Sequence, residues 1–466
     1  MLFSSAIFLF FFLPLLLSVY FLAPKKTKNL VLLIASLAFY TFGEKELVLL
    51  ILASVLIDYS AGRIIEGGWR KAGLYFSIIS NLGILFYFKY SSFVYENYYI
   101  FLEFFELNTD GINTLPEVIL PLGISFFTFQ TMSYTIDVYR GNVKASKNII
   151  DFATYVTMFP QLVAGPIVRY KDIYKQLQKR TITRSMFAEG LERFIIGLAK
   201  KMIIANNVAY IADGAFGVPT DQLSTSFAWV GIIAYSFQIY FDFSGYSDMA
   251  IGLGKMLGFD FLENFNYPYT SKSIREFWRR WHISLSTWFR DYVYIPLGGN
   301  RKSVLRTYMN LFLVFFVTGL WHGASWNFIV WGLLHGLFIV FEKIGFEKVL
   351  NKLKFGLSNI YTVLIIIITW VFFRAESLER AIGYLEAMFI FSNDNGLMLY
   401  FLRKESVLAI LFAIIFSMNI YGFLRDKFSH RKAYYYSKFI VLITLFLISI
   451  MYLAVDSYNP FIYFKF

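Results

Sequence analysis

The sequence contains no cysteine, and only 16% of its 466 residues are charged. The absence of cysteine excludes disulfide bonds, thiolate metal sites and a cysteine-bound acyl intermediate. The scarcity of charge is equally informative, because soluble globular domains average about 25% charged residues. With 58% hydrophobic residues and a mean hydropathy of +0.56, the chain cannot cover a water-facing surface with polar groups. We therefore expect a polytopic membrane protein.

Several common catalytic motifs are also missing. There is no G-x-S-x-G nucleophile elbow, no Walker loop and no H-E-x-x-H zinc motif. The glycines of GLGKMLG (252–258) do not have the spacing of a dinucleotide-binding loop. We predict no metal and no permanently bound cofactor. The net charge of +12 reflects basic cytoplasmic loops in such a protein, so no nucleic-acid partner is expected.

Continuous apolar runs recur along the chain, which predicts membrane helices and excludes the alternating ten-residue segments of a β-barrel. The first run ends at Lys25 and Lys26 and lacks a basic segment before it, so we expect a retained helix and not a signal peptide. Placing the clusters of Lys and Arg in the cytoplasm puts the N-terminus outside. The bilayer is the expected environment of the chain.

Two segments do not fit simple spans. Basic residues flank both ends of 149–166, which contains FPQLVAGP, so this segment should enter and leave on one side as a re-entrant element buried in protein. Pro160, Gly165 and Pro166 should break a helix there. The mixed-charge segment 374–389 has helical spacing of its apolar residues and is expected to lie along the outer interface.

A histidine lies in the stretch VTGLWHGASW (317–326), inside a long apolar region. Arg306 and Lys343 should both be cytoplasmic, so the chain must rise and return between them. The dozen residues from Met309 to Leu320 reach only about 18 Å as a helix. His322 is therefore expected within the protein at membrane depth, where an ionisable side chain indicates function. The alternative is a neutral core histidine that bonds across helices.

The segment 273–300 is too charged to span and too aromatic for a free loop, which predicts an interfacial or partly buried helix. It contains His282, for which a catalytic role and an ordinary surface position both stay open. Asp242 and Asp248 lie in another apolar run and need partners, either the arginines of 273–300, a histidine ring or other ion pairs. The residues predicted to bind substrate or donor are Trp278, Arg279, Arg280, Trp281, Arg290, Asp242, Ser244, Asp248 and Trp321.

Acyl transfer would use these groups together. A neutral imidazole can take the proton of a hydroxyl as that hydroxyl attacks a thioester. Arginines and lysines can hold the phosphates of coenzyme A. A variant makes His322 the nucleophile, which carries the acyl group briefly before transfer.

The same residues carry a family resemblance. The chain resembles the membrane-bound O-acyltransferases, in particular the bacterial branch with the membrane subunits of alginate O-acetyltransferases, peptidoglycan O-acetyltransferases and the teichoic-acid D-alanyl transfer protein. The resemblance rests on five stretches that follow in family order: LPLGISFFTFQTMSYTIDVYRG (120–141), MFPQLVAGPIVRY (158–170), FDFSGYSDMAIGLGKMLGF (241–259), FWRRWHISLSTWFRDYVYIPLGGN (277–300) and TGLWHGASWNFIVWGLLHG (318–336).

This resemblance implies a fold and a reaction. The fold would be all-α, with roughly 11–13 membrane helices plus re-entrant and interfacial helices around a thin core with opposed cavities. One domain would cover 1–466, with its core at about 115–345 and peripheral helices at both ends. The family's catalytic histidine falls on His322 and its second position on His282.

The implied activity is transfer of an acetyl group from cytoplasmic acetyl-CoA to an extracytoplasmic polysaccharide, in a bacterial cell membrane. An esterase-like partner of the SGNH type or a polysaccharide synthesis complex would assist. Three alternatives stay open: transfer of D-alanyl or another acyl group to a cell-wall polymer, a proton-coupled transporter that uses His322, Asp242 and Asp248, and a scaffold that anchors an extracellular enzyme.

Overall fold

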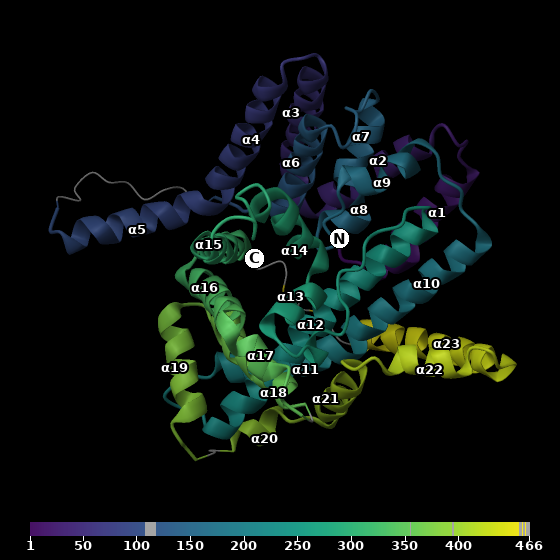
Figure 1. The fold of residues 1–466 in the computed structure, drawn as a ribbon. Coiled ribbons are helices and arrows are strands. Elements are labelled where there is room, and N and C mark those ends of the chain that lie inside the picture. The colour runs from purple at the N-terminus through teal and green to yellow at the C-terminus, as the bar shows by residue number, and fades with distance from the viewer. Residues whose placement is uncertain (108–117, 355, 394–395, 456–458, 460–461, 463–466) are drawn as a thin grey trace. The chain divides into compact units, whose positions relative to one another are not determined.

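The computed structural model of the chain describes all residues except 108–117, 355, 394–395, 456–458, 460–461 and 463–466. The described residues form helices and no strand, which confirms the prediction of an all-α protein (Figure 1). They group into two compact units, one of residues 1, 10–181 and 323–325, the other of residues 2–9, 182–322 and 326–466. Each unit is described by itself below. A single functional domain over 1–466 stays a prediction.

In the first unit, three long helices pack against one another: α3 (Val48–Glu66), α4 (Arg70–Leu85) and α6 (Ile124–Arg140). Buried polar side chains join them, since Asp58 accepts a hydrogen bond from Asn81 (2.8 Å) and Ser77 bonds Thr135 (2.8 Å). Such hydrogen bonds hold helices together in lipid. The other helices of the unit are α1 (Leu13–Leu22), α2 (Lys28–Glu44), α5 (Ser91–Phe104), α7 (Ile149–Thr157), α8 (Phe159–Leu162) and α9 (Tyr170–Gln178).

The segment 149–166 breaks as predicted. Helix α7 ends at Thr157, Met158 has non-helical backbone angles, and the single turn of α8 carries Pro160 near its start. Residues 152–168 are buried throughout, which satisfies the condition that irregular backbone at membrane depth be enclosed in protein. Entry and exit on one side of the membrane stay a prediction.

The second unit is built around α12 (Thr225–Met256), a 32-residue helix that is almost entirely buried. Helices α10 (Arg184–Ala199) and α11 (Asn206–Gly217) pack along it. The remaining helices are α13 (Ile274–Arg280), α14 (Ile283–Phe289), α15 (Val304–His322), α16 (Trp326–Phe341), α17 (Glu347–Leu350), α18 (Leu357–Arg374), α19 (Leu378–Phe389), α20 (Leu397–Phe401), α21 (Lys404–Phe416), α22 (Ile420–Phe428) and α23 (Lys432–Val455).

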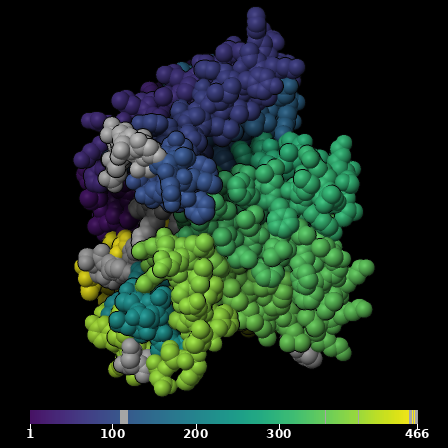
Figure 2. All heavy atoms as spheres, turned by 90° about the vertical axis from the view of Figure 1, so that its left-hand side faces the viewer, coloured from purple at the N-terminus to yellow at the C-terminus, as the bar shows by residue number. Residues whose placement is uncertain are grey.

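Helix α16 shows how a membrane helix of this unit divides its faces. Trp326, Leu333, Leu337 and Phe341 are exposed at helical spacing, as expected of a lipid-facing stripe. The other face, which includes Trp331, is buried. In the space-filling view of Figure 2, residues around 300–390 form a large part of the visible surface of this unit.

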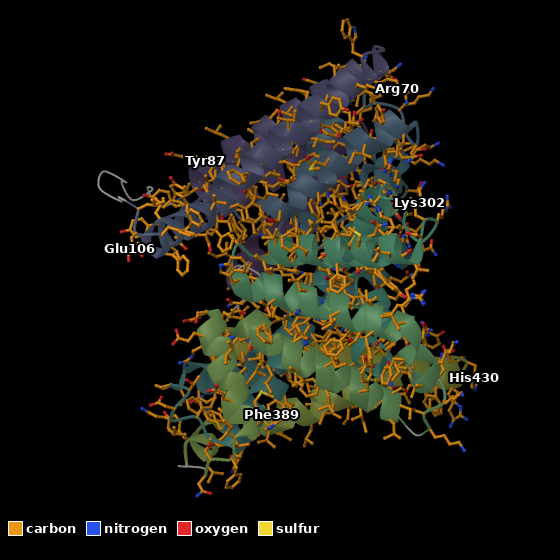
Figure 3. The ribbon with its side chains drawn as sticks, turned by 60° about the vertical axis from the view of Figure 1, so that its left-hand side comes forward. Arg70, Tyr87, Glu106, Lys302, Phe389 and His430 are labelled. Carbon is orange, nitrogen blue, oxygen red and sulfur yellow. The ribbon has the colours of Figure 1, made fainter. Side chains whose placement is uncertain are left out.

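Seven helical stretches in the described part of the chain are long and apolar enough to span a membrane, or eight if the bent pair α21–α22 is one span. This is fewer than the 11–13 predicted, because several apolar runs fall on short, broken or polar-rich helices such as α7 and α8. Within the first unit, Figure 3 shows Arg70 and Glu106 toward opposite ends of the stretch formed by α4 and α5. Within the second, Lys302 and His430 lie at one edge in that view.

Candidate active site

His322 is the last residue of α15, and α16 begins four residues later at Trp326. The two helices cross closely at glycines: a Cβ atom added to Gly319 would lie 2.3 Å from the Phe328 carbonyl oxygen, and one added to Gly332 would lie 2.3 Å from that of Phe315. Only residues without a side chain permit this approach. The crossing therefore determines where the end of α15 lies.

Aromatic rings surround the His322 imidazole, which is 3% exposed and thus shielded from lipid. Trp321, Trp331 and Phe373 lie edge to face with it, at centroid distances of 4.9, 5.0 and 5.2 Å. We call these three side chains the aromatic cage. The cage orients the ring by packing, which is the arrangement expected of a side chain that must be held in one rotamer.

His282 is completely buried and connects two short helices. Where one helix was predicted over this segment, the chain instead turns at His282, whose backbone is left-handed (φ 44°, ψ 55°). Its Nδ1 bonds Asn264 Oδ1 at 3.1 Å. An amide oxygen only accepts, so Nδ1 carries the proton of the neutral ring and Nε2 carries the lone pair. Burial lowers the pKa of His282 from 6.5 to about 3, which keeps it neutral at physiological pH.

The Trp321 ring packs near both of the histidines predicted to be catalytic. Its ring centroid is 6.0 Å from that of His282 and 4.9 Å from that of His322. The tertiary structure thus brings together two residues that are forty positions apart in the sequence.

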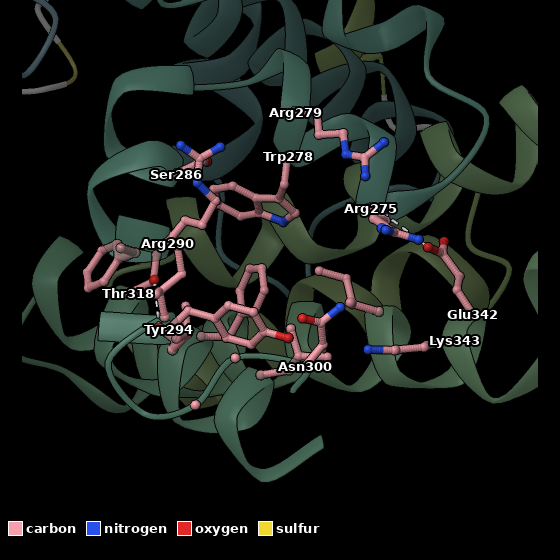
Figure 4. A pocket seen from close by; sticks show the side chains of 18 of the residues that line it. Arg275, Trp278, Arg279, Ser286, Arg290, Tyr294, Asn300, Thr318, Glu342 and Lys343 are labelled. Atoms are coloured by element: carbon pink, nitrogen blue, oxygen red, sulfur yellow. Dashed lines mark hydrogen bonds between the residues drawn. The ribbon is translucent and has the colours of Figure 1, made fainter. Parts of the chain in front are cut away.

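A cavity of about 700 Å³ lies within the second unit, between α13, α14, α15 and α16. Figure 4 shows the charged ends of Arg275, Arg279, Arg290 and Lys343 around it, with the Trp278 indole across its interior. Other lining residues, such as Phe289 and Phe315, are apolar and buried. Of the residues predicted to bind the donor, Trp278, Arg279 and Arg290 line this cavity. His322 does not line it.

A second, more polar cavity of about 430 Å³ shares Arg275, Arg279 and Glu347 with the first. Arg280 also lines it and pairs with Glu276 at 2.9 Å. Between them the two cavities take in four of the nine predicted binding residues. Trp281 and Trp321 are instead buried against other rings, and Ser244 is buried in α12.

The two acidic residues of α12 form ion pairs, as one of the predicted alternatives has it, but not with the arginines of 273–300 or with a histidine ring. Asp242 pairs with Lys201 at 2.7 Å, and Asp248 pairs with Arg193 (2.6 Å) and Lys200 (2.7 Å). None of these basic residues belongs to 273–300. Neither carboxylate lines either cavity, so both act here as ion pairs that hold α12 to the helices beside it.

Residues that sequence reasoning did not single out also line the larger cavity. Arg275, Arg301, Lys302 and Lys343 were recognisable only as members of basic loops. Glu342 accepts hydrogen bonds from the first backbone N–H groups of α13 (2.6 and 3.1 Å). No local sequence motif predicts this contact. The described residues contain no group of three or more His, Cys, Asp or Glu side chains that could hold a metal ion.

Comparison with known proteins points to one family. Residues 8–375, which include both histidines, match the model of the membrane-bound O-acyltransferase family. The chain is 48% identical over 400 residues to a probable alginate O-acetylase of Pseudomonas aeruginosa (84% of this chain, 75% of the relative). It is 41% identical over 494 residues to that of Pseudomonas putida (100% of both) and 38% identical over 446 residues to a peptidoglycan O-acetyltransferase of Helicobacter pylori (87% and 82%).

Proposed function

Since the chain belongs to the membrane-bound O-acyltransferase family, and is thus a multi-pass membrane O-acyltransferase, we propose that it moves an acetyl group from cytoplasmic acetyl-CoA to a cell-surface polysaccharide. The names of its relatives support an extracytoplasmic polymer as the acceptor. The proposal of acetyl-CoA as the donor rests on the larger cavity, which combines a cationic rim with an apolar interior.

The charge of that rim suits coenzyme A. Two carboxylates, Glu342 and Glu347, face six cationic side chains. Guanidinium and ammonium groups bind phosphates by charge-assisted hydrogen bonds, and an apolar interior suits the pantetheine arm. Thr318, on the cavity wall, precedes His322 by one helical turn, about 6 Å along the axis. The six cations are Arg275, Arg279, Arg290, Arg301, Lys302 and Lys343.

His322 is the proposed base. Its imidazole takes the proton of the acceptor hydroxyl while the hydroxyl oxygen attacks the thioester carbonyl. The C–S bond then breaks, and the proton passes to the thiolate, which leaves as free coenzyme A. In the alternative order, an imidazole nitrogen attacks first and carries the acetyl group until the hydroxyl takes it. His282, with the lone pair on Nε2, is the proposed helper.

The test replaces His322. His322→Ala should abolish acetylation of the cell's polymer while the protein still inserts and accumulates in the membrane. Wild-type acetyl levels in that variant would refute the role of His322. Rapid acid quenching followed by mass spectrometry separates the two orders, because only the second leaves an acetyl group on the peptide that contains His322.

The donor can be tested separately. The natural chain has no cysteine, so a thiol reagent reports coenzyme A release without background from the protein. We expect Arg279→Gln and Arg301→Gln to raise the KM for acetyl-CoA. Unchanged values in both variants would reject the cavity as the donor site, whereas turnover of another acyl thioester in preference to acetyl-CoA would reject the acetyl donor alone.

The proposed orientation places the N-terminus outside and the cavity rim in the cytoplasm of a bacterial cell. Single cysteines introduced into the cysteine-free chain test this arrangement. A cysteine at Lys302 should react with an impermeant maleimide only after the cells are permeabilised, and one at Glu376 should react in intact cells. The reverse pattern would overturn the orientation. A secreted esterase-like partner of the SGNH type, or the polymer synthesis complex, is proposed to receive the acetyl group outside.

A further inference from the structure

His335 lies on the buried face of α16 and is 0% exposed. The Trp278 indole N–H donates a hydrogen bond of 3.2 Å to its Nδ1. The ring also packs against Trp331, one turn earlier on the same helix, at a centroid distance of 4.9 Å. This histidine has no part in the function proposed above, yet it contacts both the cavity wall and the aromatic cage.

The hydrogen bond defines the protonation state of His335. An indole N–H can only donate, so Nδ1 must accept and the proton of the ring must lie on Nε2. Protonation of both nitrogens, or the opposite tautomer, would break the bond. The contact therefore exists only with a neutral imidazole in one tautomer, which a packing contact alone would not require.

Trp278 both bonds His335 and lines the donor cavity. It lies on α13, a helix of only seven residues, and it lines the cavity together with its neighbours Arg275 and Arg279. So short a helix is weakly held by its own backbone, since half of its N–H groups lack helical partners. The Trp278 ring packs against Phe315 and Trp331, and the bond to His335 adds a directional contact at the indole N–H.

The same indole is connected to the His322 site through Trp331. The Trp331 ring lies 5.7 Å from Trp278 and 5.0 Å from His322, measured between centroids. A change in the tilt of Trp278 would thus alter the cavity interior and the ring that packs against His322. The contact between Trp278 and Trp331 thus connects the cavity with the surroundings of His322.

We propose that His335 is a positioning residue, which holds the Trp278 indole as the inner wall of the donor cavity and thereby orients the thioester end of the donor toward His322. The inference rests on the proposed function of that cavity. His335 itself touches neither substrate nor the reacting atoms in this proposal.

Two substitutions of different chemistry test the bond. In His335→Asn, the side-chain oxygen lies close to the position of Nδ1 and can accept from Trp278. In His335→Phe, the size and aromatic packing remain but the acceptor is lost. We expect His335→Phe to raise the KM for acetyl-CoA about tenfold, because an unsatisfied buried donor costs roughly one hydrogen bond. His335→Asn should restore a KM near that of the wild type, and kcat should change less than KM in both.

A double-substitution cycle identifies the partner. Trp278→Phe removes the N–H donor, so adding His335→Phe to it should raise KM no further. If the two effects instead multiply, or if His335→Asn behaves like His335→Phe, the hydrogen bond is not the cause and the inference is overturned. Coenzyme A release from protein in lipid nanodiscs, followed with a thiol reagent, gives all the values.

Arg279→Gln distinguishes failure of this inference from failure of the donor site. If Arg279→Gln raises KM and His335→Phe does not, the cavity binds the donor and only the role of His335 is refuted. If neither variant raises KM, the donor site and the positioning role fall together. Thermal unfolding of each variant shows whether a change in KM reflects the cavity or a general loss of stability.

Discussion

Replacement of His282 by asparagine distinguishes the roles of the two ring nitrogens of this histidine. Nδ1 donates to Asn264 Oδ1 at 3.1 Å. The side-chain NH₂ of an asparagine at position 282 can make the same donation, whereas nothing replaces Nε2. The variant should therefore keep the local structure and lose the group that can titrate. It isolates the contribution of one imidazole to stability and to catalysis.

The expected magnitude follows from the shift in pKa. Burial lowers the pKa of His282 from 6.5 to about 3, so the folded protein stays neutral there at a pH where the unfolded chain binds a proton. The contribution to stability is thus complete above pH 6.5 and is lost progressively as the pH falls from 6.5 toward 3. At pH 5 the loss amounts to 1.5 pH units, or about 2 kcal/mol.

Chemical denaturation in detergent micelles at pH 7.5 and pH 5 measures this loss. The wild-type free energy of unfolding should fall by about 2 kcal/mol more than that of His282→Asn over this interval. Equal pH dependence in wild type and His282→Asn would refute the inference that a buried neutral imidazole contributes to the fold. Loss of acetyl transfer by His282→Asn, with normal stability at pH 7.5, would support the role of Nε2.

Two further predictions concern the frame around the site. Asp248→Asn removes the buried carboxylate that pairs with the partly exposed Arg193 and Lys200, and should destabilise the protein by about 2 kcal/mol, because Arg193 keeps its pair with Glu263. Glu263→Gln, at an exposed carboxylate, should cost less than about 1 kcal/mol in the same denaturation assay, and similar costs would contradict the ion-pair argument. Gly332→Ala would place a Cβ 2.3 Å from the Phe315 carbonyl oxygen and should lower both thermal stability and activity. Gly336→Ala should be tolerated, because the nearest atom there is a side-chain carbon at 3.3 Å. Equal loss in both variants would show that the close crossing does not position His322.

The environment of the protein could be predicted from composition alone. Membrane burial depends on the mean polarity of long stretches, and 58% hydrophobic residues with 16% charge leave no soluble alternative. The family could be predicted too, because its motifs are contiguous: the stretches around His282 and His322 each carry their pattern without reference to the rest of the fold. The family match over residues 8–375 confirms that resemblance.

Local signals were less reliable where a segment mixes charge with aromatic rings. One helix was predicted over 273–300, yet the chain turns at His282 and forms α13 and α14. The left-handed backbone at His282 is unfavourable for a residue with a Cβ, so no propensity scale predicts it. Contacts with Asn264, a residue outside the segment, accompany the turn: His282 bonds its amide oxygen, and the Ile283 N–H donates to its carbonyl at 3.0 Å.

The sequence by itself determined that this chain folds in lipid as helices, that its chemistry is acyl transfer, and that the chain turns at the WHG motif around His322. These properties follow from composition, contiguous motifs and the spacing of apolar residues, all of which are local. Only the tertiary structure decided that Asp242 pairs with Lys201, that Trp278 bonds His335, and that the Trp321 ring packs near His282. Each of these contacts joins residues about forty or more positions apart, and such partners are selected by helix packing and by the need to satisfy buried polar groups, which no single stretch of sequence encodes.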